Sequence, residues 1–148
     1  MHEARKAAFA KTAETIIKNL KKRNIEGYYC ASSADAVKLV RELVPEGSSI
    51  TWGGSESFAE TGVKDMLLAG NYRIIDRSRA TTPEEQREIW RERVCADYHF
   101  MSANAITTGG EIVNIDGNAD RLSLLLHGPE HVIMLVGANK VVSDVESG

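Results

Sequence analysis

The sequence predicts an α/β protein in which a mostly parallel sheet lies between two layers of helices, with one β-hairpin added. Three observations support this class. Short apolar segments alternate with amphipathic segments along the chain, which is typical of strands linked by helices. The short segments are apolar on both faces, as buried parallel strands are. Gly109-Gly110 separates two short apolar segments and indicates a hairpin turn.

The chain begins with a predicted amphipathic helix over residues 3–22. Its apolar positions have helical spacing and are Phe9, Ala13, Ile16, Ile17 and Leu20. The aromatic and apolar segment at 27–31 predicts a strand. Ser32, with Asp35 three residues later, is typical of a capped helix start, so we expect a second helix over 34–44.

The same alternation continues to the end of the chain. Strands are expected at residues 48–52, 72–76, 98–102 and 131–136, and helices at 56–69, 84–96 and 119–126. Thr82-Pro83-Glu84-Glu85 combines an N-cap, a proline in the first turn and a glutamate at the third helical position. In the helix at 119–126 we expect Leu122, Leu125 and Leu126 to share the buried side.

Composition limits the protein class. The chain has 148 residues, 43% of them hydrophobic and 26% charged, so we expect one globular domain over 1–148. A net charge of -3 and a pI near 5.8 argue against nucleic-acid binding. No apolar segment approaches the roughly 18 residues that cross a bilayer, so we expect a soluble, cytoplasmic protein without membrane insertion. Cys30 and Cys95 are expected to be buried reduced thiols, without a disulfide or metal site.

The first candidate ligand site follows the strand at 48–52. Gly53 and Gly54 lead into a helix, so a ligand can approach the backbone there, and the hydroxyls of Ser55 and Ser57 add donors. Ligands of parallel sheets gather beyond the carboxyl ends of the strands, where helix N-termini favour anions. The alternative is a tight structural turn capped by Ser55.

The second candidate lies in the polar turn after the hairpin. Asp116, Gly117 and Asn118 precede the helix at 119–126, and Asn104 supplies another amide near the start of the hairpin. Asparagines placed where aliphatic residues would pack better indicate a site at the strand ends. The alternative assigns Asn118 to an N-cap and Asp116 to a turn.

Other polar residues are weaker candidates. Asp97 and His99 share one face of a predicted strand, and form either an acid/base pair or a structural histidine beside an unrelated carboxylate. Lys140 either faces the crevice of the two turns or lies along the surface. His127 is expected near the free carbonyls of the last helix. No metal site is predicted.

Nearly the whole chain resembles the LUD domain of lactate utilisation proteins, most specifically in its second half. The resemblance rests on Trp52-Gly53-Gly54-Ser55, Asn104-Ala105-Ile106-Thr107, the segment 110–117, Arg121, Gly128-Pro129 and the segment 136–142. It implies a fold similar to ribose-5-phosphate isomerase, glucosamine-phosphate deaminase and CoA transferases, and adds Arg121 to the candidate ligand-binding residues. Where the family tends to read Asp-Gly-x-Gly-Asn-Arg, this chain has Ala119 and Asp120, which implies a less open turn that is less welcoming to an anion.

The resemblance also implies a function. Members of the family are linked to the oxidation of L-lactate to pyruvate beside iron–sulfur partner subunits, so we expect a small anionic metabolite as the ligand. Whether the chain is an enzyme stays open. The alternative is a non-catalytic sensor or assembly module that docks onto the iron–sulfur partners. Cluster-binding cysteines are absent from the sequence, so no cofactor of its own is expected.

We also expect self-association. The chain ends at Gly148, soon after the apolar segment 131–136, and is shorter at this end than is usual for the family. An uncovered apolar face or sheet edge is commonly satisfied by a symmetric partner. A homodimer is therefore predicted, through the last strand or through the Phe9-Ile16-Leu20 face of the first helix.

Overall fold

The computed structural model describes residues 3–54 and 56–148, and it confirms the predicted α/β class. The strands are β1 (Ser49–Trp52), β2 (Arg73–Ile74), β3 (Tyr98–Met101), β4 (Ala105–Thr107), β5 (Ile112–Val113), β6 (His131–Met134) and β7 (Val141–Val142). The α-helices are α1 (Glu3–Lys22), α2 (Ser33–Leu43), α3 (Glu56–Glu60), α4 (Val63–Ala69), α5 (Pro83–Val94) and α6 (Asp120–Leu126). Short 3₁₀ turns follow at η1 (Arg77–Arg79), η2 (Ala138–Lys140) and η3 (Val145–Ser147).

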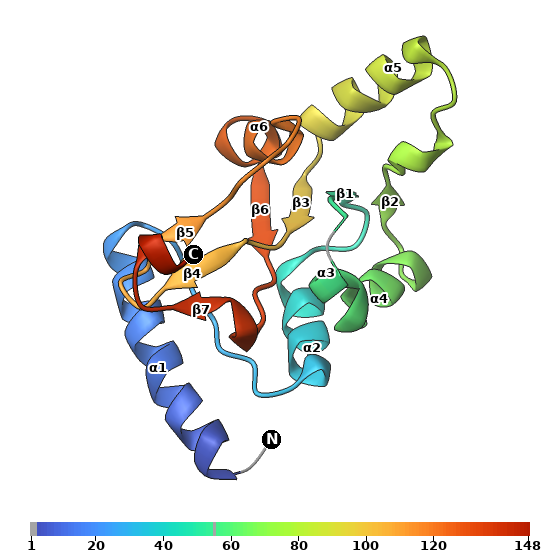
Figure 1. Cartoon of the computed structure of the whole chain (residues 1–148). Helices are drawn as coiled ribbons and strands as arrows, with labels where there is room; N and C mark the ends of the chain where they lie inside the picture. The colour runs from blue at the N-terminus through green and yellow to red at the C-terminus, as the bar shows by residue number, and fades with distance from the viewer. Residues whose placement is uncertain (1–2, 55) are drawn as a thin grey trace.

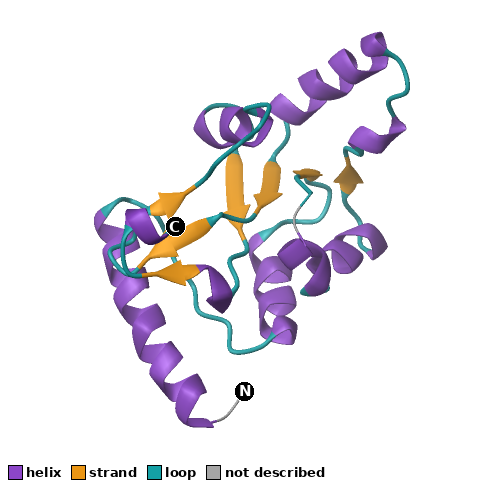
Figure 2. Cartoon of the chain, in the orientation of Figure 1, coloured by secondary structure: helices purple, strands orange, loops and turns teal. Residues whose placement is uncertain are grey.

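The strands form two sheets. Four parallel strands lie in the order β2-β1-β3-β6, and three more lie in the order β5-β4-β7 (Figures 1 and 2). The predicted hairpin is confirmed, because β4 and β5 pair antiparallel around Gly109-Gly110. The fold resembles the expected three layers, with α2, α3 and α4 on one face of the parallel sheet and α5 and α6 on the other.

The helix starts follow the sequence signals. The Ser32 side chain accepts a hydrogen bond from the amide of Asp35, and the Thr82 side chain accepts one from the amide of Glu85. Each bond satisfies an amide that has no partner within its own helix. The N-terminal helix has the predicted bounds, and Ala13, Ile16 and Leu20 are its buried residues.

Two apolar clusters hold the layers together. The larger one joins the parallel sheet to α2, α3 and α4, and its buried members are Val40, Val44, Ile50, Phe58, Val63, Leu67 and Phe100. In the smaller one, Ile16 and Leu20 of α1 pack against Ile106 of β4. Figure 1 shows α1 running alongside the second sheet. The first helix therefore covers that sheet within the same chain.

The contact between α1 and the hairpin requires a glycine. Gly110 has a φ of +85°, and a Cβ there would lie 3.0 Å from backbone atoms of Asn19 and Leu20. The side chain of Asn19 donates a 2.9 Å hydrogen bond to the carbonyl of Thr108 in the same turn. The hairpin is thus fixed to α1 by a close backbone approach that another residue would obstruct.

Three sequence predictions are wrong. Residues 27–31 form no strand and lie in the connection from α1 to α2, where Tyr28 is 52% exposed. In α6 the buried leucine is Leu124, whereas Leu126 is 80% exposed, because the side of the helix that carries Leu124 packs against the rest of the fold. Cys95 is exposed at the end of α5 and Cys30 is half-buried; both are free thiols.

Candidate functional site

The face of the parallel sheet under α5 carries polar side chains. Thr51 on β1 and His99 on β3 are neighbours in register, and neither is exposed to solvent. Arg93, in the last turn of α5, contacts Thr51 and is also buried, at 4% exposure. The opposite face is filled by apolar side chains. A polar layer gives up hydrophobic burial, so these residues indicate a use beyond packing.

The guanidinium of Arg93 is a buried cation with neutral hydrogen-bond partners. Its Nε donates to Thr51 Oγ1 at 2.9 Å, and its Nη2 donates to the carbonyl of Trp52 at 3.5 Å. Its carbon Cζ lies 5.6 Å from the centre of the Trp90 ring, a cation–π contact. Within the described part of the chain no carboxylate forms an ion pair with it. A buried charge normally has a counter-ion in direct contact, and the described carboxylates supply none to Arg93.

The pKa of Arg93 is consistent with this environment. Burial lowers that pKa, the positive charge of Arg77 lowers it further, and the carboxylate of Asp120 raises it in part. Two cations are therefore close enough to repel each other. An anion between them would relieve both the repulsion and the cost of burial.

His99 lies in the same layer as a neutral, buried imidazole. Burial lowers its pKa from 6.5 to about 4, and the charge of Arg93 acts in the same direction. A backbone group of Thr51 opposes the shift, but its geometry falls short of a hydrogen bond, and both ring nitrogens have no partner among the described atoms. Of the two alternatives for Asp97 and His99, the acid/base pair is not formed among the described residues, and the Asp97 carboxylate accepts a hydrogen bond from the amide of Ser49.

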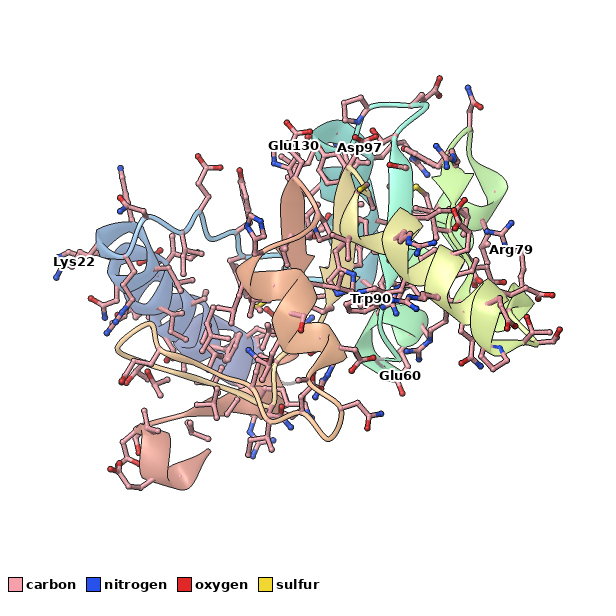
Figure 3. All side chains as sticks on the ribbon, turned by 90° about the horizontal axis from the view of Figure 1, so that it is seen from above. Lys22, Glu60, Arg79, Trp90, Asp97 and Glu130 are labelled. Carbon is pink, nitrogen blue, oxygen red and sulfur yellow. The ribbon has the colours of Figure 1, made fainter. Side chains whose placement is uncertain are left out.

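The glycine turn after β1 lies against two more arginines. A Cβ on Gly53 would lie 3.6 Å from the side-chain carbons of Arg121, and a Cβ on Gly54 would lie 3.3 Å from Nη2 of Arg77. We call Arg77, Arg93 and Arg121 the arginine cluster. In Figure 3, Trp90 on α5 lies away from Asp97 and Glu130, which mark the amino ends of β3 and β6. The predicted turn is thus a cationic region at the carboxyl end of β1.

Asp116 positions one member of this cluster. Its Oδ1 accepts a 2.6 Å hydrogen bond from Nε of Arg121, and its Oδ2 accepts one from the amide of Leu122 at 3.0 Å. The pKa of Asp116 is lowered, chiefly by the hydrogen bond from the Arg121 side chain. Both carboxylate oxygens are therefore engaged within the chain. Asp116 holds Arg121 over Gly53 and caps the first turn of α6.

Asn104 connects the hairpin to the same region. Its Oδ1 accepts a 2.9 Å hydrogen bond from the amide of Ile115, and the carbonyl of Ile115 accepts one from Nη2 of Arg121 at 2.6 Å. A chain of contacts therefore runs from Asn104 through Ile115 and Arg121 to Gly53. These contacts link the two sequence segments that were predicted to share a site.

Asp120 is the second carboxylate at the cluster. Its Oδ2 lies 3.8 Å from Nη1 of Arg77, and its side chain is 33% exposed. The residue before it, Ala119, is the N-cap of α6 and has a φ of 60°, in the left-handed region. Ala119 stands where the family pattern has glycine, so the backbone conformation that glycine favours is kept without it.

The remaining predicted site residues are not part of the arginine cluster. Gly117 and Asn118 are exposed in the turn before α6, and Asn118 is not the N-cap of that helix. Lys140 lies in η2, which leads to the second sheet, and among the described residues it makes no ion pair or side-chain hydrogen bond. Ser55 lies outside the described residues, as does the side chain of Ser57.

The sequence reasoning missed Arg77 and Arg93. Arg93 lies in the helix predicted at 84–96, where no site residue was expected, and Arg77 follows β2 in a segment without a recognised motif. A usable signal was the position of Arg77 just beyond the carboxyl end of a parallel strand. Ser102, after β3, and Asn114, after β5, were also missed, and each has a buried oxygen without a partner among the described atoms.

Two surface hollows among the described residues lie elsewhere. One of about 320 Å³ is lined by Tyr28, Tyr29, Cys30, Asp35, Lys38, Leu39 and Glu42. Another of about 230 Å³ is lined by Arg79, Ala80, Glu85, Glu88, Ile89 and Glu92. Neither includes the glycine turn. Over residues 3–54 and 56–148, no three His, Cys, Asp or Glu side chains are grouped to hold a metal ion.

One family model covers most of the chain. The model of the LUD domain matches residues 13–148, which include the arginine cluster and both glycine-bearing turns. The chain belongs to the LUD domain family. This family is associated with lactate utilisation. No curated protein and no solved structure shows a significant match. Among the described helices of this LUD domain, none is long and apolar enough to cross a membrane.

Proposed function

We propose that this LUD domain binds a small anionic metabolite at the arginine cluster, as a component of the oxidation of L-lactate to pyruvate. The observation that carries the proposal is the buried guanidinium of Arg93, whose hydrogen-bond partners are a hydroxyl and a carbonyl. Removing a charge from water costs several kcal/mol unless an opposite charge compensates it. A carboxylate such as that of L-lactate or pyruvate supplies this charge.

The surroundings of Arg93 suit a ligand of this class. Gly54 is exposed and lies under Nη2 of Arg77, so a small anion can approach both the cation and the backbone. Arg121 is held over Gly53 by Asp116. Glycine-bearing turns at strand ends recur in anion sites because backbone N–H groups can point at the ligand.

The second candidate is a non-catalytic sensor or assembly module that docks onto iron–sulfur partner subunits. One observation favours it. His99, a buried imidazole on which the charge of Arg93 acts, has no exposed surface, whereas an acid or base must be within hydrogen-bond reach of its substrate. Binding and catalysis therefore need separate measurements.

Binding is tested by thermal unfolding with L-lactate, pyruvate and inorganic phosphate. A ligand that binds the native state raises the melting temperature as its concentration rises. We expect a rise with at least one carboxylate. Arg77→Gln should reduce that rise without loss of folding, because the side chain of Arg77 is half-exposed. Arg87→Gln, an exposed position on α5, is the matched control and should leave the rise unchanged.

Turnover then separates the two candidates. Lactate oxidation removes two electrons, so the assay supplies an artificial two-electron acceptor dye and follows its reduction with L-lactate. Dye reduction that is lost in Arg77→Gln supports a catalytic component. Carboxylate binding without dye reduction supports the sensor or assembly module. If none of the three anions shifts the melting temperature, the proposed binding function is wrong.

A further inference from the structure

Asp116 and Asp120 differ in how closely their carboxylates are bound to the arginine cluster. Both oxygens of Asp116 accept hydrogen bonds, from Arg121 and from the amide of Leu122. Asp120 lies 3.8 Å from Arg77, a separation too long for a hydrogen bond. No side-chain hydrogen bond holds the Asp120 carboxylate to another described residue. Asp120 is therefore a charge beside the cluster that is free to be displaced.

The charge of Asp120 acts on other groups besides Arg77. It also acts on Arg93 and on His99, and it raises the pKa of each. One carboxylate at the start of α6 thus lies beside Arg77 of η1 and acts electrostatically on Arg93 of α5 and His99 of β3. This is the place that the ligand anion would take under the proposed function.

The balance of charge limits the ligand. The three guanidiniums of the arginine cluster face two carboxylates, those of Asp116 and Asp120, while burial keeps His99 neutral. Among these five described groups, one positive charge is left over. A ligand with a single negative charge neutralises the site, whereas a ligand with two leaves a negative excess in a partly buried region.

We propose that Asp120 is a specificity-determining residue, an internal carboxylate that competes with the ligand anion and makes the site favour ligands with one negative charge over those with two. The inference rests on the proposed function and names the ligand class of that same site. Coulomb repulsion scales with the charge of the ligand. Asp120 therefore weakens the binding of a dianion about twice as strongly, in logarithmic terms, as that of a monoanion.

The test compares L-lactate with L-malate, two hydroxy acids that carry one and two negative charges at neutral pH. Their dissociation constants are measured by calorimetry at low ionic strength for the wild type and for Asp120→Asn. We expect lactate to bind about five-fold tighter to the variant and malate about twenty-five-fold tighter, since the second gain is the square of the first. The gains should shrink when salt is added.

Glu14→Gln is the matched control. It removes one negative charge at an exposed position on α1, so it reports the effect of net charge alone and should change neither constant by more than about two-fold. Melting temperatures without ligand show that each variant is folded. The inference is overturned if lactate binds the wild type and Asp120→Asn strengthens neither acid, or strengthens both equally. If neither acid binds either folded protein, the proposed function fails first, and the inference fails with it.

Discussion

Nε of Arg93 donates a 2.9 Å hydrogen bond to Oγ1 of Thr51, and this bond joins the last turn of α5 to β1 in the buried layer. Thr51 stands two residues before Gly53, so the bond fixes a guanidinium close to the glycine turn. The threonine hydroxyl is neutral and supplies no opposite charge. The bond therefore holds a buried cation at the carboxyl end of β1, where the proposed anion would bind.

Gly54→Ala should affect ligand binding more than stability. A Cβ at this position would lie 3.3 Å from Nη2 of Arg77, the far end of a flexible side chain, and Gly54 does not have a positive φ. We expect a loss of less than about 1 kcal/mol in the free energy of unfolding. The displaced arginine should lower the affinity for a carboxylate several-fold, measured by calorimetry.

Gly117→Ala is the control for that change, because a Cβ there meets nothing within 4 Å. It should leave both stability and carboxylate affinity close to those of the wild type. A large fall in the melting temperature of Gly54→Ala, with unchanged affinity, would assign Gly54 to a structural turn.

Ala119→Gly should stabilise the protein. Ala119 has a φ of 60° and a ψ of 11°, a left-handed conformation that costs an L-residue about 1 kcal/mol more than glycine. Part of this gain is offset by the greater freedom of glycine in the unfolded chain. We expect the free energy of unfolding, measured by urea denaturation, to increase by about 0.5 to 1 kcal/mol.

Asn24→Gly provides the comparison, since Asn24 has a φ of 61° and asparagine tolerates this region well. Its effect should be smaller than that of Ala119→Gly. Equal or opposite effects at the two positions would show that left-handed strain at Ala119 is not what limits stability.

The sequence predicted most helices and strands because their signals are local. Ser32 and Thr82 accept the N-cap hydrogen bonds that their spacing to acidic residues indicates. The segment 27–31 misled because aromatic and apolar composition does not supply a neighbouring strand, and here the parallel sheet ends at β2 and β6. Strand formation depends on a partner, which the sequence of one segment cannot reveal.

Part of the candidate site could be predicted because its sequence signals are also local. Glycines at a strand end are visible in the sequence, and Gly53 and Gly54 do lie against arginines. Arg93 shares a helix with many exposed charges, so its burial depends on how α5 crosses the sheet. Asn118 looked like an N-cap, but Asp116 supplies the oxygen that accepts from the first turn of α6. The burial of Arg93 and the capping of α6 depend on packing between segments that are distant in the sequence, which local patterns do not show.

His99 should make stability depend on pH. Its pKa is lowered to about 4 in the folded protein from 6.5, so the unfolded chain binds more protons between these values. Stability therefore rises with pH through this window and is lost as pH falls from about 6.5 to 4. The difference between the two pKa values corresponds to about 3 kcal/mol at most in the free energy of unfolding.

His99→Leu isolates this contribution. Leucine of similar size removes two buried nitrogens that have no hydrogen-bond partner, so the variant should be at least as stable as the wild type at pH 7. Chemical unfolding at several pH values should show a shallower loss of stability for the variant between pH 6.5 and 4. Parallel curves for the two proteins would show that His99 titrates normally.

The outer edge of β6 should mediate a homodimer. β6 pairs with β3 on one side only within the described residues. The amides of His131 and Leu135 bond to the β3 side, so those of Val132 and Met134 point away from it. An apolar edge with unpaired amides is a template for another strand. The alternative surface on α1 is less available, because Ile16 and Leu20 are buried within the chain.

Light scattering after gel filtration at micromolar concentration decides this prediction. We expect the mass of a dimer for the wild type and of a monomer for Val132→Pro, because proline removes an outward amide that the parallel sheet does not use. Val132→Thr keeps that amide and should remain a dimer. A monomeric wild type, or a Val132→Pro variant that stays dimeric while folded, would show that the edge of β6 forms no such interface.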